Sequence, residues 1–109
     1  MTRLKYRRCE VFIESENGKK KVRAYELASF PEGLVAHKRR GRWVITHKPS
    51  GQLVSYYSYD TLQEALRKIK QLYELSSKVF LDWNEDEEKL RQRISPSLVV
   101  KIDKILGGG

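Results

Sequence analysis

The chain has 109 residues, of which 33% are charged and 39% hydrophobic, and it carries two Trp, six Tyr and three Phe. So many apolar and aromatic side chains exclude a disordered chain, and the length predicts one domain spanning residues 1–109. The net charge of +8 favours an acidic partner, and the single cysteine excludes a fold held by intrachain disulfides.

The first predicted element is a strand in YRRCEVFIE, where apolar and polar residues alternate. The two sides of this strand hold Cys9, Val11 and Ile13 and, opposite them, Arg8, Glu10, Phe12 and Glu14. Asn17-Gly18 is the preferred pair for a tight hairpin turn, with Glu16 and Lys19 opposite each other across it. This turn predicts a second strand from about Lys20 to Leu27.

Three further apolar segments, LVAHK, RWVITHK and LVSYYSY, are separated by turn signals at Arg39-Arg40-Gly41 and Pro49-Ser50-Gly51. Together with the first hairpin they predict an antiparallel sheet of four or five meandering strands over about residues 6–59. The expected fold class is therefore α+β, because the sheet is followed by helical sequence.

The hydrophobic period changes from two to between three and four at Asp60. A helix is predicted over about residues 61–75, begun by Asp60 or Thr61 as the cap. One or two further helices are expected from Glu85 to Ile94 and after Ser95-Pro96. Residues 1–75 would then form a core of sheet and helix, and residues 76–109 a helical extension.

The last predicted hairpin determines which aromatic rings are exposed. If Ser50-Gly51 forms its tip, Thr46 pairs with Ser55, Val44 with Tyr57 and Arg42 with Tyr59 on the exposed face. The helix would then cover the opposite face, which carries Trp43, Ile45, Val54 and Tyr56. A slip of one residue in the pairing would exchange the two faces.

The charge excess lies in the first part of the chain. Residues 1–59 hold 13 Lys/Arg and 5 Asp/Glu, whereas residues 60–109 hold 9 of each. Cations interleaved with aromatic rings on a sheet are typical of surfaces that bind single-stranded nucleic acid. We therefore expect a non-catalytic protein that binds single-stranded DNA or RNA. The candidate contact residues are Lys19, Lys20, Lys21, Lys38, Arg39, Arg40, Arg42 and Lys48 for phosphates, and Tyr57 and Tyr59 for bases.

The alternative is a small protein-interaction module, an inhibitor or adaptor of the phage or plasmid type. It would dock its basic sheet on an acidic protein, or pair its C-terminal helices with a second copy as a homodimer. Both hypotheses predict a cytoplasmic protein without a membrane partner, since no apolar run approaches the roughly 20 residues of a membrane span.

Catalytic, metal and cofactor sites are not expected. Asp82, Asn84 and Asp86 match the opening of a calcium loop, but Glu87 replaces its glycine and Arg93 replaces its final glutamate. His37 and His47 lack the Cys/His spacing of a zinc site, and they are expected to be strand residues at the edge of the core. Cys9 alternates with apolar residues, which predicts a small buried side chain rather than a nucleophile.

Overall fold

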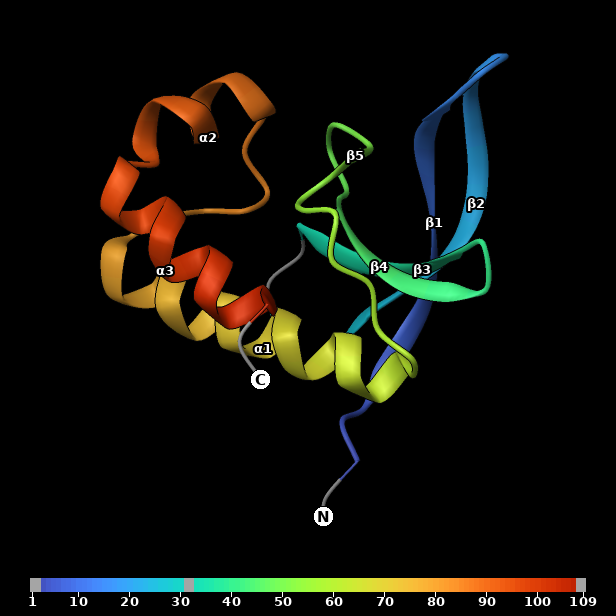
Figure 1. The fold of residues 1–109 in the computed structure, drawn as a ribbon, viewed down its shortest axis with the longest axis horizontal. Coiled ribbons are helices and arrows are strands. Elements are labelled where there is room, and N and C mark those ends of the chain that lie inside the picture. The colour runs from blue at the N-terminus through green and yellow to red at the C-terminus, as the bar shows by residue number, and fades with distance from the viewer. Residues whose placement is uncertain (1–2, 31–32, 108–109) are drawn as a thin grey trace.

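The computed structural model describes residues 3–30 and 33–107. Its five strands pair antiparallel in chain order, β1-β2-β3-β4-β5, and form one curled sheet (Figure 1). The strand bounds are β1 Tyr6–Ser15, β2 Gly18–Leu27, β3 Leu34–Arg39, β4 Arg42–His47 and β5 Gln52–Leu53. The predicted meander, and with it the α+β fold class, is confirmed.

Three helices follow the sheet, α1 Leu62–Val79, α2 Glu87–Arg93 and α3 Pro96–Gly107. Thr61 caps α1, because its hydroxyl oxygen accepts a hydrogen bond from the Glu64 backbone N–H at 3.1 Å. Helix α1 lies against one face of the sheet, and α3 lies beside α1 (Figure 1). The predicted helices are confirmed, although α1 continues beyond residue 75 as far as Val79.

Two of the hairpins have a glycine with positive φ at the turn, Gly41 between β3 and β4 and Gly18 directly after the turn between β1 and β2. The loop between β3 and β4 consists of Arg40 and Gly41, both with positive φ (54° and 82°), as a type I′ turn needs. In the first hairpin Ser15 pairs with Gly18, so the turn residues are Glu16 and Asn17. The predicted pairing across this turn was therefore wrong, because Glu14 and not Glu16 lies opposite Lys19.

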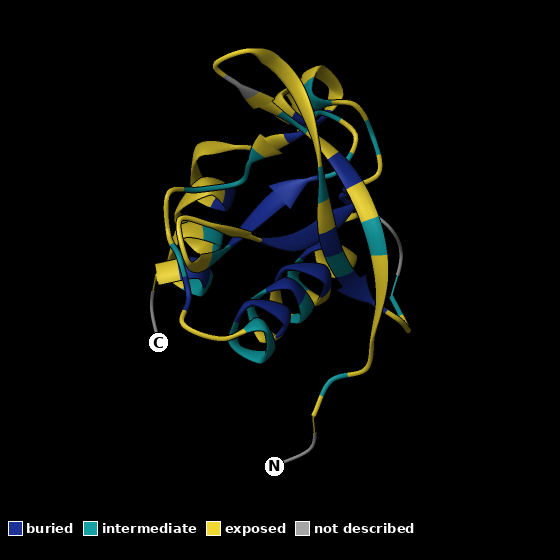
Figure 2. Cartoon of the chain, turned by 90° about the vertical axis from the view of Figure 1, so that its right-hand side faces the viewer, coloured by how far each residue is buried: buried dark blue, intermediate teal, exposed yellow. Residues whose placement is uncertain are grey.

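The strands bury side chains on both faces of the sheet. On the side of α1, Leu34, Ala36 and Ile45 pack against buried residues of that helix. On the other side Val11, Ala24 and Val35 form a smaller cluster inside the curl, with Cys9, Ile13 and Val22 packed at its edge. Figure 2 shows the buried strands β3 and β4 behind the largely exposed β1–β2 hairpin.

The chain returning from β5 to α1 does not keep the predicted register. Thr46 pairs with Leu53 rather than Ser55, and Trp43 forms a bridge with Tyr59. From Trp43 to Thr46 the β4 strand advances by three residues, whereas from Leu53 to Tyr59 the returning chain advances by six. The returning chain therefore contains three extra residues between the two pairs. An odd excess reverses which side chains face the core.

Four expectations about exposure are wrong, and the reversed facing of the returning chain explains two of them, those for Tyr56 and Tyr59. Tyr56 was expected in the core but is 96% exposed, whereas Tyr59 was expected at the surface but is 5% exposed. Val44 and Thr46 were expected on the exposed face but are buried, because the curl of the sheet covers their side of β4. Trp43 is half-buried against the main core, on the side predicted for it. Ile45 and Val54 do pack in or against that core, as predicted.

The curl closes where Gly51 meets β1. Gly51 has a φ of 73°, and a Cβ atom on it would overlap the carbonyl oxygen of Phe12. Only glycine permits the end of the β4–β5 hairpin to approach the β1 backbone this closely.

In the part of the chain that the structure describes, no helix is long and apolar enough to cross a membrane.

Gly51→Ala should lower the free energy of unfolding by roughly 2–5 kcal/mol, since it adds positive-φ strain and a backbone overlap. Gly41→Ala is the matched control, because Gly41 also has positive φ but its Cβ would meet no atom within 4 Å. That control should lose only about 1–2 kcal/mol of strain energy. Equal losses in urea titrations of the two variants would contradict closure at Gly51.

Candidate nucleic-acid interface

Three aromatic rings form a row across the sheet. The ring centroids of Tyr6 and Tyr25 lie 5.4 Å apart, and those of Tyr25 and Trp43 lie 5.7 Å apart, both in edge-to-face geometry. Lys38 extends the row, because its Nζ lies 5.6 Å from the centroid of the Trp43 ring. The row thus joins residues of β1, β2, β3 and β4 that are distant in sequence.

Strand alternation explains why these rings share one face. Cys9, Val11 and Ile13 point into the small cluster within the curl, so the residues that alternate with them on β1 point the opposite way. Arg8 lies directly opposite Tyr25 in the β1–β2 ladder, and Phe12 lies opposite Lys21. The face therefore combines rings and cations with the carboxylates of Glu10 and Glu14. We call it the outer sheet face and define it by its rings and cations, Tyr6, Arg8, Phe12, Lys21, Arg23, Tyr25, Lys38 and Trp43.

The outer sheet face begins where α1 stops covering the sheet. Leu4 and Gln63 exchange two hydrogen bonds, of 2.8 and 3.1 Å, which hold the chain before β1 against the first turn of α1. Beyond this point the β1–β2 hairpin continues without a helix over it (Figure 1). Most of its side chains on this face are accordingly exposed, including the large apolar ring of Phe12.

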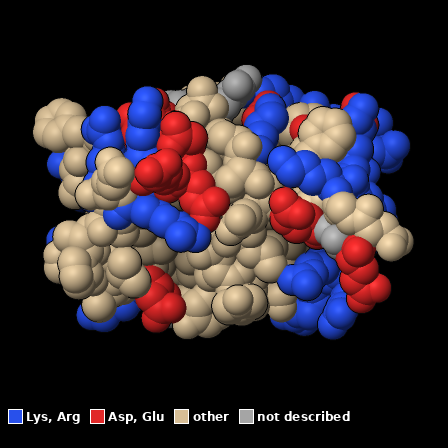
Figure 3. All heavy atoms as spheres, turned by 90° about the horizontal axis from the view of Figure 1, so that it is seen from above, with Lys and Arg blue, Asp and Glu red and all other residues tan. Residues whose placement is uncertain are grey.

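The cations of this face have few internal partners. Lys21 lies 3.9 Å from Glu10 and 5.7 Å from the Phe12 ring centroid, both across the β1–β2 ladder. Within residues 3–30 and 33–107, Arg8 and Arg23 form no ion pair with a carboxylate. In Figure 3 Lys and Arg side chains gather at the end of the molecule formed by the β1–β2 hairpin, with uncharged and acidic side chains among them.

The phosphate-contact residues predicted from the sequence lie in several different parts of the structure. Lys21 and Lys38 belong to the outer sheet face, and Lys19 and Lys20 are exposed beside it at the start of β2. Arg40 is exposed at the β3–β4 turn. Arg42 is held by the chain before α1, since its guanidinium donates to Asp60 Oδ1 at 2.6 Å and to Ser58 Oγ at 2.7 Å.

The two tyrosines predicted to stack on bases do not lie on the outer sheet face. The Tyr59 hydroxyl donates to the Leu106 carbonyl at 2.7 Å, and burial raises the pKa of Tyr59 to about 12. Tyr57 donates to Asp103 at 3.1 Å, a hydrogen bond that raises the pKa of this phenol. The stacking role predicted for Tyr59 is wrong, because the reversed register turns its ring into the core.

Lys48 also has a structural partner. Its Nζ lies 3.6 Å from Glu26 Oε2, while the Arg7 Nε donates to the other carboxylate oxygen of Glu26 at 2.8 Å. Glu26 is buried, and neighbouring cations offset the desolvation cost of a buried carboxylate. Lys48 therefore balances an internal charge.

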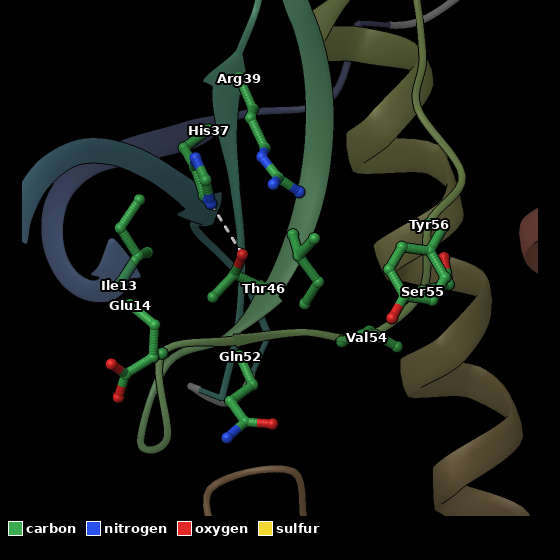
Figure 4. Close-up of a pocket in the computed structure, with 11 residues that line it drawn as sticks. Ile13, Glu14, His37, Arg39, Thr46, Gln52, Val54, Ser55 and Tyr56 are labelled. Atoms are coloured by element: carbon green, nitrogen blue, oxygen red, sulfur yellow. Dashed lines mark hydrogen bonds between the residues drawn. The ribbon is translucent and has the colours of Figure 1, made fainter. Parts of the chain in front are cut away.

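A cavity of about 370 Å³ lies at the mouth of the curl (Figure 4). Arg39 reaches toward it from β3, and Glu14 and Gln52 border it. Its floor contains His37 and Thr46, whose Nε2 and Oγ1 atoms lie 2.7 Å apart. These two residues are 1% and 0% exposed, so a substrate cannot reach a His–Thr pair that otherwise resembles a base and a nucleophile.

Both histidines are buried strand residues with structural hydrogen bonds. Burial lowers the pKa of His37 below its ordinary 6.5, and the nearby Arg39 charge lowers it further. His47 Nε2 donates to the carbonyl oxygens of Trp83 and Glu85, at 2.8 and 2.9 Å, and so joins β4 to the loop before α2. Across the described residues no three His, Cys, Asp or Glu side chains gather as a metal site.

No protein-family model, curated protein or solved structure matches this chain. The assignment therefore depends on the geometry of the site. Sequence reasoning missed Tyr6, Arg8, Phe12, Arg23 and Tyr25 as members of the outer sheet face, although they occupy alternate positions on the two strands of the first hairpin. Their alternation in the sequence could have indicated that they share one face of the hairpin.

The low pKa of His37 predicts acid sensitivity. An unfolded chain binds a proton on this histidine near pH 6.5, whereas the folded chain does not, so stability should fall as the pH drops below about 6.5. The slope is at most about 1.4 kcal/mol per pH unit from this one group. Urea unfolding between about pH 7.5 and 5 should show a shallower fall for His37→Gln than for the parent, and identical slopes would contradict a neutral buried His37.

Proposed function

We propose that the chain binds single-stranded nucleic acid, DNA or RNA, through the outer sheet face and without catalysis. The observation that carries the proposal is the row of Tyr6, Tyr25 and Trp43, bordered on three strands by cations. Tyr6 is exposed and Tyr25 and Trp43 are half-buried, so the uncovered parts of these rings offer stacking surfaces for bases, and Arg and Lys beside them offer phosphate contacts. A sheet with both along one face matches the two chemical parts of a nucleotide.

A single strand suits this face better than a duplex. In a duplex the flat faces of the bases are stacked on one another, and aromatic side chains cannot reach them. A duplex would therefore engage the cations and leave the rings without partners. Stacking on an aromatic side chain contributes roughly 1–3 kcal/mol per base, which favours the single strand.

The phosphate contacts that we propose differ in part from those expected from the sequence. Arg8, Arg23, Lys21 and Lys38 lie among the rings, and the exposed side chains of Lys19, Lys20 and Arg40 extend the basic surface beyond them. We do not include Arg42 among the principal contacts, because its guanidinium already binds Asp60 and Ser58.

The first test removes charge from the outer sheet face. Changing Arg8, Arg23 and Lys38 together to Gln should weaken binding of a fluorescent oligothymidine of about 15 nucleotides, measured by anisotropy. The slope of log affinity against log salt should become shallower by about 0.7 per lost phosphate contact, or roughly two units in total. Folding should change little, since exposed charges contribute little to stability.

The matched control changes Lys89, Lys101 and Lys104 to Gln, which removes the same charge from exposed positions on α2 and α3. Its salt slope should stay near that of the parent protein. Equal effects of the two triple variants would mean that net charge, and not this face, governs binding. If the parent binds no nucleic acid at low salt, the proposal fails and docking on an acidic protein becomes the better hypothesis.

The second test removes one ring. Tyr25→Ala should lower the affinity for the oligonucleotide by roughly 1–3 kcal/mol and leave the salt slope nearly unchanged, because stacking releases no counterions. Tyr56→Ala is the control, since Tyr56 is highly exposed but lies off the outer sheet face. Loss of affinity in the Tyr56 variant alone would place the bases on another surface.

A further inference from the structure

Phe80 combines two unusual features at the end of α1. Its side chain is 89% exposed, and its backbone has a φ of 57° in the left-handed region. A bulky residue with positive φ is uncommon, and a large apolar ring in water is unfavourable. Both costs occur at one residue, which suggests that its exposed ring has a use.

The helix end itself needs the left-handed conformation but not a phenylalanine. The Leu81 N–H donates to the Ser76 carbonyl at 3.0 Å and so closes the last turn, while Leu81 is buried beneath it. This motif normally places glycine at the position of Phe80. Glycine would satisfy the same hydrogen bonds without strain and without exposing a ring.

A groove of about 650 Å³ is lined by sequence neighbours of this residue, among them Lys78 and Leu81. One wall consists of Phe30 and Tyr73, whose rings stack with an interplanar angle of 11° and a centroid distance of 5.7 Å. Leu81 and Trp83 also line the groove, and the Trp83 indole N–H donates to Ser76 and is therefore not available to a ligand. The groove is mainly apolar and wide enough to admit an aromatic side chain.

The charges around the groove indicate what would fill it. Glu74, Lys78 and Asp82 line it, so its charge is mixed with an acidic excess, which disfavours nucleic acid or an acidic peptide. Phe80 is itself flanked in sequence by Lys78 and Asp82. A second copy of this chain would therefore bring to the groove the Phe80 ring together with the opposite charges of Lys78 and Asp82.

We propose that two copies associate about a twofold axis, each placing Phe80 in the groove of the other. A projecting ring beside a matching groove on one chain is self-complementary, as a twofold interface requires. Lys78 of each copy would meet the carboxylates of the other. The interface is small, so the association is weak and depends on concentration.

This contact is independent of nucleic-acid binding. Phe80 follows the last residue of α1, whereas Trp43 is bridged to Tyr59 just before its first residue. Eighteen helical residues span about 27 Å, so the two surfaces lie at opposite ends of α1. A dimer of this kind would leave both outer sheet faces uncovered.

Sedimentation equilibrium from about 10 µM to about 1 mM tests the proposal. The weight-average mass of the parent should rise from 12.8 kDa toward twice that value, whereas Phe80→Gly should remain at 12.8 kDa throughout. The melting temperature of Phe80→Gly at low concentration should equal or exceed that of the parent, because glycine relieves the strained φ. Tyr56→Ala, which removes another exposed ring, should associate like the parent.

Charge variants test the orientation of the two copies. Lys78→Glu should weaken association at least tenfold, and adding Asp82→Lys to it should restore much of the loss. A parent that stays monomeric up to about 1 mM overturns the proposal. So does a Phe80→Gly variant that associates as strongly as the parent.

Discussion

Two backbone hydrogen bonds between Trp43 and Tyr59 position much of this molecule. The Trp43 N–H donates to the Tyr59 carbonyl at 2.9 Å, and the Tyr59 N–H donates to the Trp43 carbonyl at 2.8 Å. They hold the chain against β4 immediately before Asp60 and the α1 cap. The direction of α1, the burial of Tyr59 and the limit of the covered sheet all follow from this bridge.

The limit of the covered sheet determines what the sheet can bind. On the α1 side, Leu34, Ala36 and Ile45 are enclosed by helices, while Tyr6, Arg8 and Phe12 extend beyond them. Trp43 lies at the boundary, with one part packed on the core and another facing Tyr25 and Lys38. The same strands thus supply a core at one end and a basic, aromatic surface at the other.

Local signals in the sequence were sufficient to predict the strands and helices, but not to predict which of their side chains face the core. Alternation on β1 and the loop at Arg40-Gly41 predicted the hairpins, and the helical period after Asp60 predicted α1. The three extra residues between Leu53 and Tyr59 were not predicted, because VSYYSY has tyrosines in both phases of a strand and either phase could face the core. For that reason the predicted rings were Tyr57 and Tyr59, whereas the row consists of rings brought together by strand order.

The basic excess of residues 1–59 has a similar explanation. Part of it is internal, since Arg7 and Lys48 balance the buried Glu26 and Arg42 binds Asp60. Composition cannot separate these cations from exposed ones, because the distinction depends on tertiary contacts. Once they are assigned, much of the remaining excess lies on and beside the outer sheet face.

The two tryptophans allow the most direct test of this account. Trp43 lies on the outer sheet face, and Trp83 is buried near the far end of α1. In a ¹H–¹⁵N NMR titration with a single-stranded oligonucleotide, the Trp43 indole resonance should shift with added strand while that of Trp83 stays fixed. A saturating titration that leaves the Trp43 resonance unchanged, or that moves only Trp83, would contradict binding at this face.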